Sequence, residues 1–221
     1  MPLLLLIRHG TNNFVKEGRI PGQAPNIHLN PEGIAQAEAL AKLLEKQPIS
    51  VVYASQLERA IETAWRIAGP RGLPIHIRPA LADTDTGDFT AKTSKELSEA
   101  PETKEIWKTI VEKPSEGRLP NGESLVEMQQ RVVGELARIC AAHPDPEMPK
   151  PIEGQPPAPP PPPTVIAVVM HADPIKASIA NFLGVPFDNF QRIGTSPASV
   201  STIMVSDKHI MVINVNRLPE V

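Results

Sequence analysis

The chain has 221 residues, of which 41% are hydrophobic, and its formal net charge at pH 7 is -3. This length can bury one sizeable hydrophobic core, so we expect a single domain over residues 1–221. The slightly acidic balance excludes a general attraction to nucleic acid or to an anionic membrane, so any anion-binding site must be local.

The cysteine content and the first ten residues favour a cytoplasmic protein. The single cysteine, Cys140, cannot form an internal disulfide, and its place in an apolar helical stripe indicates a buried structural side chain. The opening MPLLLLIRHG holds only a short apolar run, with no basic segment before it and no small-residue cleavage site after it. We interpret it as a first strand, not as a signal peptide or a membrane span.

The first part of the chain alternates predicted strands and helices. Residues 3–7 are a continuous apolar run of strand length, typical of a strand covered on both faces. Asn30 and Pro31 predict a helix start, because Asn is a good cap and Pro suits the first helical position. Next come a strand, a helix and a shorter strand, predicted at residues 49–53, about 57–68, and 75–77.

The later part begins with a polar segment at residues 80–123, rich in Thr, Ser, Glu and Gly. We assign it to loops and short helices over the sheet, where insertions often shape substrate pockets. Apolar residues at helical spacing then predict a long helix over about 123–142. The last predicted elements are a strand at 165–170, a helix capped by Asp173 and Pro174 that runs to about Leu183, and an edge hairpin of strands 200–205 and 210–215.

A proline-rich segment separates the long helix from the strand that follows it. Residues 144–163 hold 11 of the 26 prolines, so they cannot form core and should form an exposed polyproline II loop. A spacer loop is the favoured interpretation. The alternative is a docking element for a protein partner with an aromatic groove.

Three predicted strands lead into basic or imidazole side chains. The first strand leads into Arg8 and His9, the strand ending at residue 170 leads into His171, and Arg59 follows the turn after the second strand. Ligands of open α/β sheets bind beyond the carboxyl ends of the strands, and neighbouring strands lie about 4.8 Å apart. Two Arg and two His side chains that converge there predict a phosphate site.

Such a site suits phosphoryl transfer. A His between cations stays neutral, and its lone pair can attack phosphorus. An alkoxide leaving group also needs a general acid, for which Asp83, Asp85 and Asp88 are the candidates, left open by the spacing alone. The sequence lacks Cys clusters, His-x-x-x-His spacing and a Gly-rich nucleotide loop, so we expect no metal and no cofactor.

Six segments, in order, resemble the histidine phosphatase superfamily, also called the phosphoglycerate mutase-like family. They are LIRHG at 6–10, HLNPEGIAQAEALA at 28–41, YASQLERAIETA at 53–64, ADTDTGDFT at 82–90, LPNGESL at 119–125 and VVMHADPI at 168–175. The resemblance covers nearly the whole chain and is interrupted at the proline-rich segment. It implies an α/β three-layer sandwich with a mainly parallel central sheet and helices on both faces.

The resemblance also implies roles for five residues. His9 corresponds to the residue that is phosphorylated in the intermediate, and His171 to the second imidazole beside the phosphoryl group. Arg8 and Arg59 correspond to phosphate ligands. The family's acid, usually Glu, falls on Asp83, whose shorter side chain reaches less far.

Asn13 and Glu123 are further candidate substrate-binding residues. Asn13 belongs to the loop after RHG, where this sequence departs from the family's usual Glu-Thr. Glu123 is equally well explained as a first-turn helix residue, because negative charge is favoured there.

The expected activity is metal-independent hydrolysis of a small phosphomonoester through a phosphohistidine on His9. The mutase branch usually carries an Arg and a Tyr just after its acid, whereas Thr84 and Asp85 follow Asp83 here, which favours a phosphatase. Two alternatives stay open. One is a phosphoglycerate mutase, with a basic cluster from Lys92, Lys95 or Arg118, and the other is a catalytically weak phospho-ligand-binding or regulatory protein.

Overall fold

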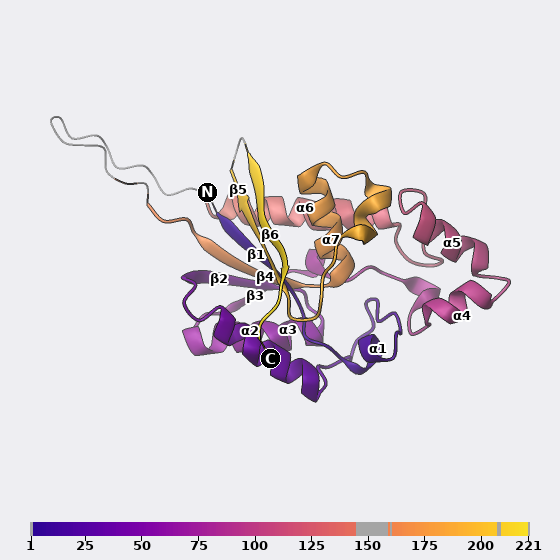
Figure 1. The fold of residues 1–221 in the computed structure, drawn as a ribbon, viewed down its shortest axis with the longest axis horizontal. Helices are drawn as coiled ribbons and strands as arrows, with labels where there is room; N and C mark the ends of the chain where they lie inside the picture. Colours follow the sequence, from indigo (N-terminus) through magenta and orange to yellow (C-terminus); the bar gives the residue numbers. More distant parts are fainter. Residues whose placement is uncertain (1, 145–158, 160, 207–208, 221) are drawn as a thin grey trace.

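A six-stranded sheet lies at the centre of the computed structural model, which describes residues 2–144, 159, 161–206 and 209–220 (Figure 1). The strands are β1 (Leu3–Arg8), β2 (Ile49–Ala54), β3 (Ile75–Ile77), β4 (Val165–Met170), β5 (Val200–Val205) and β6 (Ile210–Arg217). Their order is β3-β2-β4-β1-β5-β6, and β1 to β4 are mutually parallel. The antiparallel β5 and β6 form the predicted hairpin at one edge.

Helices cover both faces of the sheet (Figure 1). The faces are occupied by α2 (Pro31–Leu43) and α3 (Glu58–Ala68) on one side and by α6 (Leu125–Ala142) and α7 (Ala172–Leu183) on the other. Alternate side chains of β1 enter two separate cores, since Leu4 and Leu6 pack with α6 and α7 while Leu5 and Ile7 pack with α2 and α3. The predicted three-layer α/β sandwich is therefore confirmed.

The helix starts follow the capping residues of the sequence. Asn30 caps α2 by accepting a hydrogen bond from the backbone N–H of Gly33, as predicted. Ser124 caps α6 in a capping box with Glu127, so the helix begins at Leu125. Glu123 precedes the cap, and the interpretation of Glu123 as a first-turn helix residue is therefore wrong. For α7 the expected cap is wrong: His171 occupies the N-cap position and Asp173 lies inside the first turn. A strand that runs directly into a helix leaves no room for a separate capping residue.

The polar segment forms short elements at one side of the sheet, as expected. It contains α4 (Ser94–Glu99) and α5 (Lys104–Glu112), and Figure 1 shows both on the side where α1 (Asn13–Lys16) also lies. The remaining short elements are the 3₁₀ helices η1 (Gly69–Arg71), η2 (Pro79–Leu81), η3 (Gly87–Phe89) and η4 (Phe187–Arg192).

Three sequence expectations concern features outside the sheet. Cys140 lies on α6 and packs against the core cluster, partly buried where full burial was expected, and this burial raises the pKa of its thiol to about 11. Most of the proline-rich segment, residues 145–158 and 160, lies outside the described residues. Among the helices that are described, none is long and apolar enough to cross a membrane.

Candidate active site

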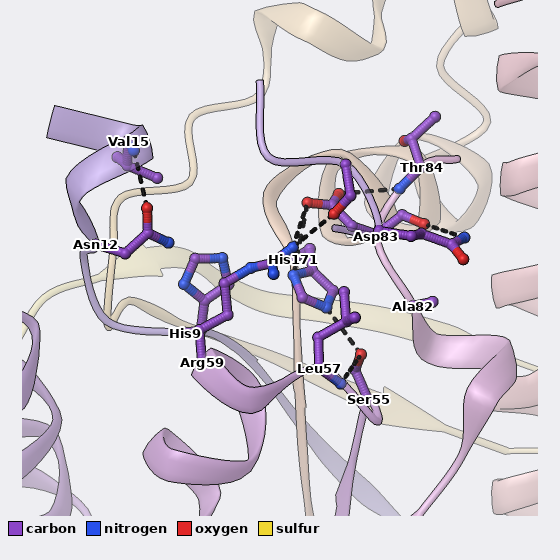
Figure 2. Close-up of polar contacts among 12 residues, drawn as sticks. His9, Asn12, Val15, Ser55, Leu57, Arg59, Ala82, Asp83, Thr84 and His171 are labelled. Atoms are coloured by element: carbon purple, nitrogen blue, oxygen red, sulfur yellow. Dashed lines mark hydrogen bonds and ion pairs between the residues drawn. The ribbon is translucent and has the colours of Figure 1, made fainter. Parts of the chain in front are cut away.

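The four basic residues expected at strand ends come together at one end of the sheet. Arg8 ends β1, His9 and His171 follow β1 and β4, and Arg59 lies in the first turn of α3, which follows β2. Because β4 lies between β1 and β2, these strand ends are neighbours. The ring centroids of His9 and His171 are 5.1 Å apart, and the Arg59 guanidinium lies between the His9 ring and Asp83 (Figure 2).

One hydrogen bond decides which nitrogen of His9 is free. Its Nδ1 lies 2.7 Å from the carbonyl oxygen of Gly10, which can only accept, so Nδ1 carries the proton. The ring is 2% exposed. Burial, and then the charges of Arg59 and Arg8, hold the pKa of His9 well below its ordinary value. The imidazole is therefore neutral, with the lone pair on Nε2.

Several buried donors around His9 have no partner among the described residues. Arg59 is fully buried, and its Nη2 donates to the carbonyl of Gly22 at 2.7 Å, but its Nε and Nη1 are unpartnered. Arg8 donates through Nη1 to the carbonyl of Thr195 and keeps a free Nε. Buried donors are normally satisfied, so this set of cationic donors is suited to a bound anion.

Asp83 lies on the other side of Arg59. Its Oδ2 is 3.3 Å from Nη2 of Arg59 and 3.6 Å from Nδ1 of His171, and its Oδ1 accepts from the Thr84 N–H. Burial raises the pKa of the carboxyl to about 6, since the nearby charge of Arg59 only partly opposes it and Asp173 adds to it. Asp83 can thus carry a proton close to neutral pH.

The two other candidate acids lie elsewhere. Asp85 and Asp88 are exposed, and their carboxylates accept hydrogen bonds from the Gly87 N–H and from the Asn121 side chain. Neither lines the cavity that contains His9. Among the three carboxylates, geometry singles out Asp83.

His171 is fixed by a residue that sequence reasoning missed. Its Nε2 is 2.9 Å from Oγ of Ser55, and that oxygen accepts a hydrogen bond from the Leu57 N–H (Figure 2). We assign the Ser55 hydroxyl as the donor to Nε2, because no other acceptor for its proton lies among the described contacts. This assignment puts the His171 proton on Nδ1, facing Asp83. Burial, followed by the charge of Arg59, holds the pKa of His171 well below its ordinary value. Ser55 directly follows β2, so the strand-end argument could have found it.

The structure places Asn13 outside the cavity. It is exposed, and its Oδ1 accepts from the side chain of Asn30. Its neighbour Asn12 is the buried residue of the pair: its Oδ1 caps α1 through the Val15 N–H, and its Nδ2 has no partner. Figure 2 shows Asn12 beside the His9 ring. Because two Asn residues are consecutive in the sequence, no sequence signal showed which of the two side chains would be buried beside His9.

Glu123 also lies outside the cavity and instead holds the segment that carries Asp83. Its carboxylate accepts from Arg131 at 2.6 and 3.2 Å and from the Asp85 N–H at 2.9 Å. Arg131 in turn donates to the carbonyl oxygens of Ala80, Ala82 and Asp83. Arg131 had no sequence signal, because a polar residue on an amphipathic helix is usually solvated.

The cavity over His9 has a volume of about 400 Å³. Its basic lining residues are Arg8, Arg19 and Lys176, and the last two are engaged, Arg19 with the Ala91 carbonyl and Lys176 with Asp173 and Gln191. The expected mutase residues Lys92, Lys95 and Arg118 are not among the lining residues. Within the described ranges, no group of three or more His, Cys, Asp or Glu side chains is arranged to hold a metal ion.

Known proteins of similar sequence and structure are mostly phosphatases. The chain is 27% identical to phosphoserine phosphatase 1 of Hydrogenobacter thermophilus over 98% of its own length and 92% of that protein. It is 29% identical to a probable phosphoglycerate mutase of Enterobacter, over 90% and 82% of the two chains. The alpha-ribazole phosphatase from Shigella flexneri matches with a TM-score of 0.79 and 27% identity, over 99% and 98%.

The family match covers almost the full sequence. Residues 4–217 fit the sequence model of the histidine phosphatase superfamily (branch 1), in agreement with the resemblance of the six segments. The protein is an enzyme of the phosphatase class, and it belongs to branch 1 of the histidine phosphatase superfamily.

Proposed function

We propose that the protein hydrolyses small phosphomonoesters in two steps, through a phosphohistidine on His9 and without a metal ion. One observation carries this proposal. His9 is neutral with its lone pair on Nε2, and the buried donors around it have no partners among the described residues. Relatives named for phosphoserine and alpha-ribazole phosphate chemistry support a small phosphorylated substrate.

In the first step Nε2 of His9 attacks phosphorus, and the bond between phosphorus and the ester oxygen breaks. The electron pair leaves with that oxygen, which takes the proton of Asp83. The phosphoryl oxygens are held by Arg8, Arg59 and Nδ1 of His171, which offer the free donors. Positioning and charge neutralisation supply most of the rate enhancement in such reactions.

In the second step water attacks the phosphohistidine. Asp83, now a carboxylate, accepts a proton from this water as the new phosphorus–oxygen bond forms. The nitrogen–phosphorus bond breaks, its electron pair returns to Nε2, and inorganic phosphate leaves. A carboxyl with a pKa of about 6 can alternate between these two protonation states near neutral pH.

The test is phosphate release in EDTA by wild type and His9→Ala. The substrates are p-nitrophenyl phosphate, phosphoserine and a panel of sugar, nucleotide and glycerate phosphates. We expect release by wild type alone, with a labelled, base-stable and acid-labile phosphoenzyme trapped by rapid quenching into alkali.

Three other outcomes would contradict the proposal. Release that requires a metal ion would exclude the metal-independent reaction. Isomerisation of a phosphoglycerate that depends on a bisphosphorylated primer would identify a mutase. Tight binding of phosphorylated compounds without turnover would identify a binding protein.

A further inference from the structure

A second cavity adjoins the cavity over His9. It has a volume of about 380 Å³, and five of its lining residues also line the catalytic cavity. These shared residues are Ile20, Thr84, Thr86, Ser94 and Asp173. We call this second cavity the annex. The alcohol part of a phosphomonoester that leaves phosphorus on the side of Asp83 can therefore extend past Thr84 into the annex.

Most lining residues of the annex are apolar, and its polar ones are Thr84, Thr86, Ser94, Asp173 and Gln191. The apolar side chains come from the loop after α1, from α5, and from the chain up to the first residue of α6: Ile20, Trp107, Ile110, Val111, Leu119 and Leu125. Trp107 packs edge-on against Phe89, with ring centroids 6.2 Å apart, so this wall is held by the core. In the part of the chain that the structure describes, no basic residue lines the annex.

We propose that the annex binds the alcohol part of the substrate and selects phosphomonoesters of apolar alcohols. This inference rests on the proposed hydrolysis at His9. An alkyl or aromatic group gains free energy when it leaves water for such a surface. A leaving group with a carboxylate or a second phosphate would lose its hydration without meeting a cation.

The polar groups at the junction fit a single ester oxygen. Thr84 is 3% exposed, and its hydroxyl has no hydrogen-bond partner among the described residues. It lies next to Asp83, the proposed acid, on the wall that the two cavities share. Thr86 is hydrogen-bonded to Thr90, and Gln191 is hydrogen-bonded to Lys176 and Asp173. The buried hydroxyl of Thr84 can therefore orient the ester oxygen, whereas a polyol would place further hydroxyl groups against apolar side chains, where each unpaired one is unfavourable.

A series of n-alkyl phosphates tests this directly. Ethyl, butyl and hexyl phosphate release alcohols of nearly equal acidity, so their chemistry is matched and only the apolar length changes. We expect kcat/KM to rise roughly two- to fourfold per methylene. Glycerol phosphate should be hydrolysed no faster than ethyl phosphate. A flat or falling series, with turnover of the short esters intact, would overturn the annex while leaving the hydrolase proposal in place.

A pair of variants on α5 locates the effect. Val111 lines the annex and is 53% exposed, so Val111→Asn should fold normally. It should lower kcat/KM for hexyl phosphate about three- to tenfold more than kcat/KM for ethyl phosphate. Ile106→Asn is the matched control, because Ile106 is 38% exposed on the same helix and lines neither cavity. Equal effects of the two substitutions would overturn the assignment.

A binding measurement decides the point even if nothing is hydrolysed. The chain has two tryptophans, and in Trp65→Phe the annex residue Trp107 is the only one left. Hexylphosphonate, which cannot be hydrolysed, should change the emission of this variant and bind more tightly than ethylphosphonate. In Trp107→Phe the exposed Trp65 should not respond. Equal affinity for the two phosphonates, with no response of Trp107, would overturn the inference.

Discussion

His9 and His171 are both buried and neutral, but their hydrogen bonds give them different roles. A carbonyl fixes the proton of His9 on Nδ1 and leaves Nε2 as a base, whereas the Ser55 hydroxyl leaves His171 with a proton to donate. Arg59 favours the neutral form of both rings. In the proposed reaction, this difference in hydrogen bonding makes His9 the nucleophile and His171 a donor to the phosphoryl group.

Asp83→Asn tests the general acid. The comparison uses kcat/KM, which reports the first step alone, because the second step is the same for every ester. Without a transferable proton, kcat/KM for ethyl phosphate should fall about 10² to 10⁴-fold. The loss on p-nitrophenyl phosphate should be much smaller, because nitrophenolate leaves without protonation. Since the acid must be protonated, wild-type turnover of ethyl phosphate should decrease as the pH rises above about 6. The substrate titrates in the same range, so the profile of Asp83→Asn is the control: it should keep only the part of the pH dependence that comes from the substrate. Equal losses on both esters would exclude the role.

Arg131→Gln tests how the acid is positioned. Arg131 donates to three backbone carbonyls around Asp83 and pairs with Glu123, so its loss should let this segment move. We expect kcat/KM for ethyl phosphate to fall about tenfold or more, with little change in kcat/KM for p-nitrophenyl phosphate. The effect should largely disappear in an Asp83→Asn background. Arg138→Gln, at an exposed position on the same helix, should leave both rates unchanged.

The site residues that could be predicted from the sequence are those that lie at or directly after the end of a predicted strand. Arg8, His9 and His171 each adjoin the end of a buried strand, so their convergence follows from a parallel sheet. The placement of Glu123 and Arg131 depends on how α6 packs against the 80–85 segment, which no local pattern encodes. Asn12 and Asn13 are the same residue type, and only the conformation of the turn decides that the side chain of Asn12 is the buried one.

At the level of elements, the start of α2 supports the turn that presents His9. The backbones approach so closely that a Cβ on Gly33 would lie 1.9 Å from the Thr11 carbonyl oxygen, and one on Gly10 would lie 2.4 Å from the Gly33 carbonyl oxygen. The hydroxyl of Thr63 on α3 accepts a hydrogen bond from the Gly10 N–H. Two helices on one face of the sheet thus fix the turn that carries His9, the proposed nucleophile.

Gly33→Ala should therefore impair both stability and activity. The clash is with backbone, which cannot yield cheaply, so we expect a loss of about 2 to 4 kcal/mol in unfolding free energy. Urea unfolding and kcat on p-nitrophenyl phosphate measure the two effects. Gly134→Ala is the matched control in α6, where a Cβ meets nothing within 4 Å, and it should stabilise by about 0.5–1 kcal/mol. An unimpaired Gly33→Ala protein would contradict the supporting role of α2.

Element boundaries were predictable where a cap or an apolar run marks them, as at Asn30 and in residues 3–7. The start of α7 could not be predicted in this way. His171 directly follows β4, is the N-cap residue of α7 and also belongs to the site. The annex was also beyond prediction, since its apolar lining comes from a segment whose composition is mostly polar.

On the scale of the whole molecule, the site is a buried polar cluster at one end of the sheet that separates two apolar cores. The strands of the sheet separate the cores, and the charged groups gather where the central strands end. The fold lowers the pKa values of His9 and His171 and raises the pKa of Asp83. Because these pKa values differ between the folded and unfolded chain, the free energy of unfolding depends on pH. The pH dependence of unfolding should therefore report the site even without substrate.

The sign of this dependence follows from proton counts. The unfolded chain protonates His9 and His171 below about pH 6.5, whereas the folded chain does not, so both residues reduce stability as the pH falls from 7 to 5. Asp83 acts in the opposite direction below about pH 6, because the folded state holds its proton more tightly than the unfolded state. Two imidazoles outweigh one carboxyl, so the site as a whole should favour unfolding at pH 5.

His9→Gln isolates one of these protons. Over pH 5 to 6.5 the unfolding free energy of wild type should change with pH more steeply than that of the variant, by up to about 1.4 kcal/mol per pH unit. Urea unfolding at half-unit pH steps measures both slopes, whatever the variant's absolute stability. His76→Gln, at an exposed position on β3, should keep the wild-type slope. Parallel slopes for wild type and His9→Gln would show that His9 is protonated in the folded protein, and a protonated His9 has no lone pair with which to attack phosphorus.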